Sequence, residues 1–254
     1  MSVDGPEWLH NLHRKRANGS GTYDAVMSGI KLLREYEVKF GLLIVVSKDT
    51  LAYPDDLFNW IVGNQFERLD LLPCFEPESI ANESDTLSPP SDQLSVFLKQ
   101  MFDLWWKHDD PQIKVRTFRD VLRYYLGVKP GVCSWQGNCS WILSVDETGN
   151  VFPCARFNGY PETSVGNITS RSLDNLLSDK RYKSLRERML EGQHECQSCV
   201  WLPACGGGCP FARYALNQGN FGGPYYFCET RKKLFAHIGQ RMGHRRRIQL
   251  PVAT

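Results

Sequence analysis

The sequence predicts an α/β protein in which parallel strands with crossover helices are followed by a small cysteine-rich domain. Two apolar runs, at 40–47 and 69–74, are each preceded by a helical pattern. This alternation is typical of a parallel sheet with both faces covered. Eight of the nine cysteines lie between Cys133 and Cys228, where glycine is also frequent. The second observation predicts a domain organised by metal ligation.

The composition is ordinary for a soluble protein. The chain has 254 residues, of which 42% are hydrophobic and 23% charged, and a net charge of +2. This balance gives no reason to expect nucleic acid as the main partner. No run approaches the roughly 18 apolar residues of a membrane span, so no membrane partner is expected. No secretory signal is visible. We therefore expect a cytoplasmic protein whose cysteines bind metal or clusters rather than forming disulfides.

The first residues predict the end of a strand that runs into a turn at Asp4-Gly5-Pro6. A strand end without its body suggests that a segment is missing upstream. Residues 7–16 are polar and basic, which is typical of a solvated loop and, alternatively, of an anion-binding loop. Thr22 is a suitable N-cap for a helix that ends near Tyr36.

The next elements complete a β-α-β-α-β order. A strand is predicted at 40–47, a helix at 54–63 with Pro54 in its first turn, and a strand at 69–74. Three strands and two helices are too few for a closed barrel, but they could form one side of a larger one.

Residues 75–92 are rich in Pro, Ser, Glu and Asp and predict a linker. Helices are expected at 94–106 and 115–126. Their aromatic side chains are expected in the core because they repeat at helical spacing. These are Phe97, Phe102, Trp105 and Trp106.

Beyond Lys129 the chain predicts a short hairpin with strands at 141–145 and 151–154. Helices are predicted at 172–191 and 227–242. Residues 244–254 include three consecutive arginines and predict a solvated basic tail.

The cysteine spacing favours iron–sulfur clusters over zinc. The cysteines between 196 and 209 follow the pattern C-x2-C-x5-C-x3-C. A zinc ribbon pairs two C-x2-C knuckles, and this chain has one. Eight thiols are two sets of four, which is what two cubane clusters need. The glycines at 206–208 suit a backbone that passes close to a bulky core.

These residues resemble a known domain. Cys139, Gly149 and Cys154, followed by the dense run and a closing Cys228, resemble the SPASM domain of radical S-adenosylmethionine (SAM) enzymes. Cys133 in front of them is similar to the anaerobic sulfatase-maturating enzymes and related peptide maturases. Segments 2–6, 9–14, 19–23 and 71–74 resemble strand ends and a loop of that family's partial (β/α)6 barrel.

The resemblance implies a domain organisation and two cofactor sites. Residues 1–75 would be the C-terminal part of the barrel, 76–127 connecting helices, 128–242 the SPASM domain and 243–254 the tail. The first of two [4Fe–4S] clusters would be bound by Cys133, Cys139, Cys154 and Cys209. The second would be bound by Cys196, Cys199, Cys205 and Cys228. Arg14 would contact the carboxylate of SAM, the cofactor of the full-length family.

The same resemblance implies a peptide or protein substrate and an electron donor such as flavodoxin or ferredoxin. The sequence departs from the family at two places. The C-x3-C-x2-C motif of the SAM-cleaving cluster is absent, so we do not expect this chain alone to cleave SAM. A missing N-terminal half or a separate chain would have to supply that site.

The second departure is Ala155, which stands where sulfatase maturases carry the aspartate that is thought to act as base. Alanine cannot accept a proton, so we expect modification of another peptide, for instance by cross-linking or epimerisation. The catalytic residues stay unassigned. Cys74 is expected to pack at a strand end, with a substrate-facing hydrogen donor as the alternative.

The sequence supports three functional hypotheses. The chain is part of a peptide-modifying enzyme, a non-catalytic SPASM module that binds a peptide beside a separate radical SAM chain, or an inactive remnant. The absent motif motivates the second, and the exposed sheet edge of a partial barrel motivates the third.

Overall fold

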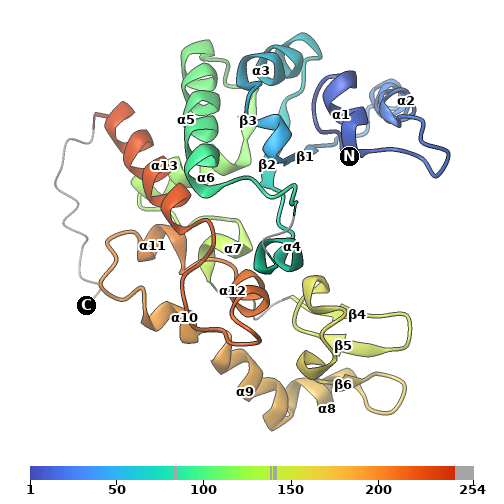
Figure 1. Ribbon diagram of the computed structural model, residues 1–254, viewed down its shortest axis with the longest axis vertical. Coiled ribbons are helices and arrows are strands. Elements are labelled where there is room, and N and C mark those ends of the chain that lie inside the picture. The colour runs from blue at the N-terminus through green and yellow to red at the C-terminus, as the bar shows by residue number, and fades with distance from the viewer. Residues whose placement is uncertain (83–84, 138, 140–141, 244–254) are drawn as a thin grey trace. The chain divides into compact units, whose positions relative to one another are not determined.

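The computed structural model describes residues 1–82, 85–137, 139 and 142–243 and divides into two compact units (Figure 1). Unit 1 comprises Met1–Leu126 together with 229–243, and unit 2 comprises Gly127–Cys228. Unit 1 holds a parallel sheet and unit 2 an antiparallel one. The predicted α/β class is confirmed.

The sheet of unit 1 contains β1 (Leu42–Val46), β2 (Arg68–Pro73) and β3 (Lys114–Val115) in the order β1-β2-β3, all parallel. Ser2 forms a parallel bridge with Leu43 on the other side of β1. The first residues therefore do continue the sheet as a strand end. The two-residue strand β3 was not predicted, because so short a segment has no alternation of its own.

Helices of unit 1 follow the predicted apolar patterns. They are α2 (Tyr23–Glu35), α3 (Pro54–Gly63), α5 (Ser91–His108), α6 (Arg116–Tyr125) and α13 (Cys228–Arg241). In α3, Leu57, Phe58 and Ile61 are buried at three- and four-residue spacing. Pro54 begins this helix because its missing N–H would have no helical acceptor there.

The predicted loop at 7–16 is wrong in its first part, which forms helix α1 (Glu7–His13). Leu9 and His10 are buried on one face of this helix. The ring of His10 accepts a hydrogen bond from the Asp4 amide at 3.2 Å, so its basic appearance in the sequence concealed an interior position. A 3-10 turn, η1, occupies Lys48–Thr50, and the predicted linker contains the short helix α4 at Pro77–Ala81.

Helix α5 supplies the aromatic core of unit 1. Phe97 and Phe102 are fully buried, and Phe102 meets Phe118 edge to face with ring centroids 5.4 Å apart. Trp105 is half-buried and donates a hydrogen bond to the Ile113 carbonyl at 2.8 Å. The core assignment of Trp106 is wrong, since it is 42% exposed.

Helix α13 packs beside α5 within unit 1 (Figure 1). Its Arg241 and His237 both donate to Asp103 of α5, at 2.8–2.9 Å. The Tyr125 hydroxyl donates to the Phe235 carbonyl at 2.7 Å. The predicted domain limits stay predictions. They place α13 in the SPASM domain at 128–242, whereas nearly all of this helix belongs to unit 1.

Unit 2 contains a small antiparallel sheet formed by β4 (Ser144–Val145), β5 (Asn150–Phe152) and β6 (Gly166–Asn167). The predicted hairpin is present in shorter form, and its start at Trp141 lies outside the described residues. The carboxylate of Asp146 closes the turn by accepting from the amides of Thr148 and Asn150.

Short helices make up the rest of unit 2. They are α7 (Cys133–Gln136), α8 (Leu173–Ser178), α9 (Lys180–Arg188), α10 (Glu191–His194), α11 (Leu202–Cys205) and α12 (Pro210–Leu216), with 3-10 turns at Ala155–Phe157 and Pro161–Thr163.

The single helix predicted at 172–191 is wrong, because Asp179 is extended and separates α8 from α9. Its side chain caps α9 by accepting from the Arg181 amide at 2.8 Å. The predicted tail at 244–254 lies outside the described residues. No helix in the described ranges is long and apolar enough to cross a membrane.

Candidate metal centre

The four cysteines expected to bind the first cluster, here called the first cysteine set, lie in unit 2: Cys133, Cys139, Cys154 and Cys209. Cys133 begins α7, Cys154 follows β5, and Cys209 is the N-cap of α12. All four are partly buried. Cys133 and Cys209 are 76 positions apart in the sequence. Each thiol of the set is therefore presented by its own local segment of the backbone.

The charges of these four thiols influence one another. Burial raises the pKa of Cys139 to about 12, and the neighbouring Cys209, Cys133 and Cys154 contribute to this rise. The pKa of Cys133 is also raised, first by burial and then by Cys209 and Cys154. The set is therefore one electrostatic cluster. Without a cation its thiolates repel one another, and a metal core that binds them as thiolates removes that repulsion.

Two arginines lie next to the first set. Arg186 of α9 donates to the carbonyl oxygens of Cys139 at 2.7 Å and Ile142 at 2.6 Å. The guanidinium of Arg156 lies 3.9 Å from the Cys209 sulfur. Arg186 holds the backbone that presents Cys139, whereas Arg156 faces a sulfur directly. Both positive charges favour an anionic metal–thiolate group at this place.

The four cysteines expected to bind the second cluster, here called the second cysteine set, are again all partly buried: Cys196, Cys199, Cys205 and Cys228. Cys196 and Cys199 lie in consecutive turns after α10, since the Cys199 amide donates to the Cys196 carbonyl at 2.9 Å. Cys205 ends α11, and Cys228 begins α13.

The loop before Cys228 is held against the segment that carries the other three cysteines. The Gly223 amide donates to the Glu195 carboxylate at 2.7 Å. Tyr225 packs on Gly208 so closely that a Cβ atom there would lie 2.5 Å from the ring. Arg213 donates both to the Gly223 carbonyl and, at 3.3 Å, to the Cys196 sulfur. These contacts hold residues 223–225, which precede Cys228, against the segment that carries Cys196.

The two sets share a close backbone contact. Gly137 ends α7 and Gly206 ends α11, both with left-handed φ angles of 61° and 60°. A Cβ atom on Gly206 would lie 2.3 Å from the Gln136 carbonyl carbon. The Gln193 side-chain amide bridges the pair by donating to both glycine carbonyls at 3.0 Å. Only glycine permits this approach.

Four thiols with adjacent arginines and a glycine-rich backbone fit a [4Fe–4S] cluster chemically, because such clusters are anionic and take four thiolates. Across the described residues, no three His, Cys, Asp or Glu side chains are arranged to hold a single metal ion. The cysteines of the first set interact through their charges rather than converging on one point.

In unit 1, Arg14 donates through two nitrogens to the carboxylate of Asp4. Asp4 also accepts from the Val45 amide at 2.9 Å, so the pair joins the first residues to β1. The expected contact of Arg14 with SAM stays a prediction. The guanidinium is about one-third exposed, which leaves part of it accessible.

Cys74 lies directly after β2, at the strand end where it was predicted. Burial and the nearby Glu76 carboxylate raise the pKa of its thiol. It faces a cavity of about 50 Å³. The cavity is lined by Asp4, Leu9, His13, Val45, Ser47, Thr50, Cys74 and Leu87. Several of these residues follow or end parallel strands, at the edge where α/β sheets usually bind ligands.

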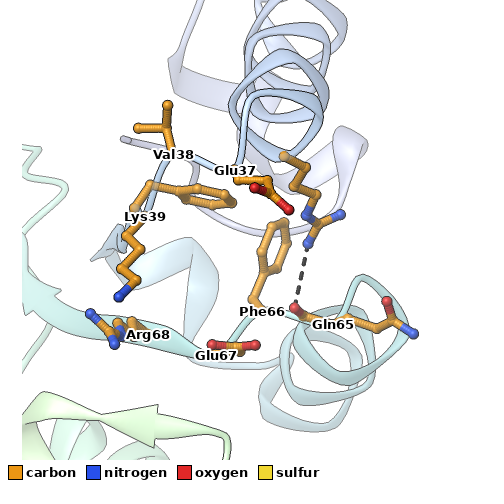
Figure 2. Close-up of a pocket in the computed structure, with 9 residues that line it drawn as sticks. Glu37, Val38, Lys39, Gln65, Phe66, Glu67 and Arg68 are labelled. Atoms are coloured by element: carbon orange, nitrogen blue, oxygen red, sulfur yellow. Dashed lines mark hydrogen bonds between the residues drawn. The ribbon is translucent and has the colours of Figure 1, made fainter.

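A larger pocket of about 280 Å³ opens at the opposite edge, beside the amino ends of β1 and β2 (Figure 2). Phe66 lies at its centre, with the Arg34 guanidinium 5.2 Å from the ring. The labelled side chains of Lys39, Glu67 and Arg68 surround the opening in Figure 2. A third pocket, of about 550 Å³, lies in unit 2 between Tyr160, Arg188 and Tyr214.

Sequence reasoning missed Arg186, Arg213 and the Gly137–Gly206 contact. A signal for Arg213 was present, since it is the one charged residue in the otherwise apolar segment 210–216 that follows Cys209. No local signal identifies Arg186, because α9 contains several arginines and lysines.

Part of this site lies in a segment that matches a known domain family. Residues 133–200 match the SPASM iron–sulfur cluster-binding domain. The chain is 30% identical over 237 residues to a cysteine-type anaerobic sulfatase-maturating enzyme of Clostridium novyi, covering 92% of this chain and 63% of the relative. It is 27% identical to a serine-type anaerobic sulfatase-maturating enzyme of Bacteroides thetaiotaomicron, covering 95% and 62%.

A solved structure of native anSMEcpe with bound AdoMet and Cp18Cys peptide matches with a TM-score of 0.85 at 26% identity. That match covers 96% of this chain and 68% of the other. The chain thus resembles mainly the C-terminal part of anaerobic sulfatase-maturating enzymes and carries an iron–sulfur cluster-binding SPASM domain. It spans less than two thirds of the length of these curated relatives, with 62–65% for four of them.

Proposed function

We propose that unit 2 binds two [4Fe–4S] clusters, one on each cysteine set, and serves as the auxiliary-cluster part of a radical SAM enzyme that modifies a peptide. The observation that carries the proposal is the match of residues 133–200, which contain five of the eight cysteines, to the SPASM iron–sulfur cluster-binding domain. In the first set, Cys133, Cys154 and Cys209 lie near enough to Cys139 to influence its ionisation, as the four ligands of one cluster would.

Each cluster would supply one-electron redox capacity to the site. The residues of this chain would hold and shield it. Arg186 fixes the Cys139 backbone, and Gln193 fixes the two glycines at which the cysteine-bearing helices α7 and α11 meet. Cys209 would join the first set while its neighbours in the run serve the second. Movement of either cluster would therefore be restricted by a backbone that both share.

A peptide substrate is proposed because a related structure holds SAM and a peptide together. The site for SAM cleavage and the electron donor would come from residues or chains other than these. Ala155 is exposed in the 3-10 turn after Cys154 and has no proton-accepting atom in its side chain. We propose that the reaction uses no base at this position and differs from the oxidation of a sulfatase cysteine or serine.

The cluster assignment is tested by three serine substitutions in the anaerobically reconstituted protein. Cys154→Ser and Cys199→Ser each remove one ligand of a different set, so each should lose about four of about eight irons per chain. The matched control is Cys74→Ser, which should keep them all. If Cys154→Ser and Cys199→Ser both keep the iron content of the control, the assignment is wrong.

A second function is favoured by the absence of C-x3-C-x2-C from the 254 residues. The chain would then bind a peptide and leave the radical chemistry to a separate chain. Both functions expect the reconstituted chain alone to release no 5′-deoxyadenosine when it is incubated with SAM and dithionite. Release by this chain alone would exclude the binding-module hypothesis.

A further inference from the structure

Arg213 is a buried charge that has no carboxylate partner in the described part of the chain. Its side chain lies in α12 and the residue is only 3% exposed. Within the described ranges it forms no ion pair with Asp or Glu, and its hydrogen bonds go to Gly207, Gly223 and Cys196. The carboxylate of Glu195, which precedes Cys196, accepts from the Gly223 amide instead.

An uncompensated buried cation is costly because it has lost its hydration without gaining a partner charge. Carbonyl oxygens satisfy the N–H groups of the guanidinium but supply no full negative charge. Among the acceptors of Arg213, only the Cys196 sulfur, at 3.3 Å, would carry a negative charge as a metal ligand. The missing negative charge therefore belongs at the second cysteine set.

The surroundings fix the guanidinium in this orientation. Its Nε donates to the Gly207 carbonyl at 2.8 Å, within the glycine turn between Cys205 and Cys209. Gly192 of α10 lies against the other side, where a Cβ atom would come within 2.6 Å of the arginine Cδ and 2.7 Å of its Cζ. Carbonyls on one side and a glycine on the other thus leave the planar guanidinium little freedom to rotate.

On the basis of the proposed function, we propose that Arg213 is the internal counter-ion of the second cluster and raises its reduction potential. Reduction adds one electron to a core that is already anionic with its four thiolates. A cation that donates a hydrogen bond to a ligating sulfur stabilises the reduced form more than the oxidised form. Arg213 is a positioning residue, because it acts through Cys196 rather than on a substrate.

The test is a potentiometric titration of the anaerobically reconstituted full chain with dithionite, followed by electron paramagnetic resonance. Arg213→Gln should make one of the two clusters at least tenfold harder to reduce, which for one electron is about 59 mV. The other cluster should keep its potential. The control is Arg181→Gln, which removes the same charge from an exposed position of α9 and should move neither potential.

Two further variants keep the test decisive if Arg213→Gln fails to fold. Gly192→Ala changes no charge but displaces the guanidinium, so it should lower the same potential. Arg213→Lys retains the charge, so its reduction potential should lie between those of Arg213→Gln and the wild-type protein. Two clusters with the potentials of the control in Gly192→Ala, and also in Arg213→Gln where that variant folds, would overturn the role of Arg213. A wild-type chain with only about four irons would instead refute the two-cluster proposal on which it rests.

Discussion

Replacing Gly206 by alanine should loosen both cysteine sets at once. Gly206 has a left-handed φ of 60°, and alanine in that conformation costs about 1–2 kcal/mol. Its Cβ would also lie 2.3 Å from two backbone atoms at the end of α7 and 2.7 Å from the Trp135 carbonyl. Backbone atoms cannot rotate away, and overpacking of this kind costs about 1–3 kcal/mol more. The total is about 2–5 kcal/mol of the free energy of unfolding.

The assay compares urea unfolding midpoints and iron content in the anaerobically reconstituted protein. Gly127→Ala is the matched control, because its φ is also left-handed, at 74°, and no atom lies within 4 Å of the added Cβ. The control should lose only the conformational part, about 1–2 kcal/mol, and keep its iron. Equal midpoints and equal iron content for the two variants would show that the contact between α7 and α11 does not hold the sets together.

Three further predictions concern single side chains. Phe102→Ala should lower the free energy of unfolding by about 3–5 kcal/mol in a denaturant titration, because its fully buried ring leaves a cavity, and a loss under about 1 kcal/mol would contradict its core position. Burial raises the pKa of Asp103, but hydrogen bonds from Arg241 and His237 outweigh it, so the net pKa is below its ordinary value. The ionised Asp103 carboxylate therefore stabilises the fold above about pH 4, which is the pKa of an unfolded aspartate. The stability difference between the wild-type protein and Asp103→Asn should vanish as the pH falls through the lowered pKa of the folded state. Comparison of unfolding midpoints at about pH 7 and about pH 3 checks this, and a constant difference contradicts it. Arg186→Gln should lose about four irons per chain on iron analysis, because the backbone of the first set is released, while full occupancy would show that the loop holds itself.

The parallel sheet and its helices could be predicted because each long element carries its own period. The helix at Pro54–Gly63 was predicted with the bounds that the structure shows. Short elements could not be predicted. The strands at Lys114–Val115 and Gly166–Asn167 have two residues each, and only their partners in the sheet define them.

Charge was a poor guide to burial in this chain. His10 looked solvated beside its basic neighbours, yet it is fully buried and bonded to the Asp4 amide. Trp106 looked like a core residue from its spacing, but the helix turns it outward. Asp179 interrupts a predicted helix because its side chain caps the next one, a choice that depends on local hydrogen bonds rather than on apolar periodicity.

The cysteines themselves were found from spacing, but the groups that support them were not. Arg186 reaches Cys139 across 47 residues of sequence, and Gln193 reaches Gly137 across 56. Contacts of this range depend on the tertiary fold, which a pattern of local residues does not encode. The grouping of the eight thiols into two sets stays a prediction that the cysteine variants test.

The central claim is that this chain holds two four-iron clusters, and the most direct measurement is its iron and acid-labile sulfide content after anaerobic reconstitution. We expect about eight irons and about eight sulfides per chain, since two cubanes require them. A content of about four irons, or zinc in place of iron without sulfide, would contradict the claim.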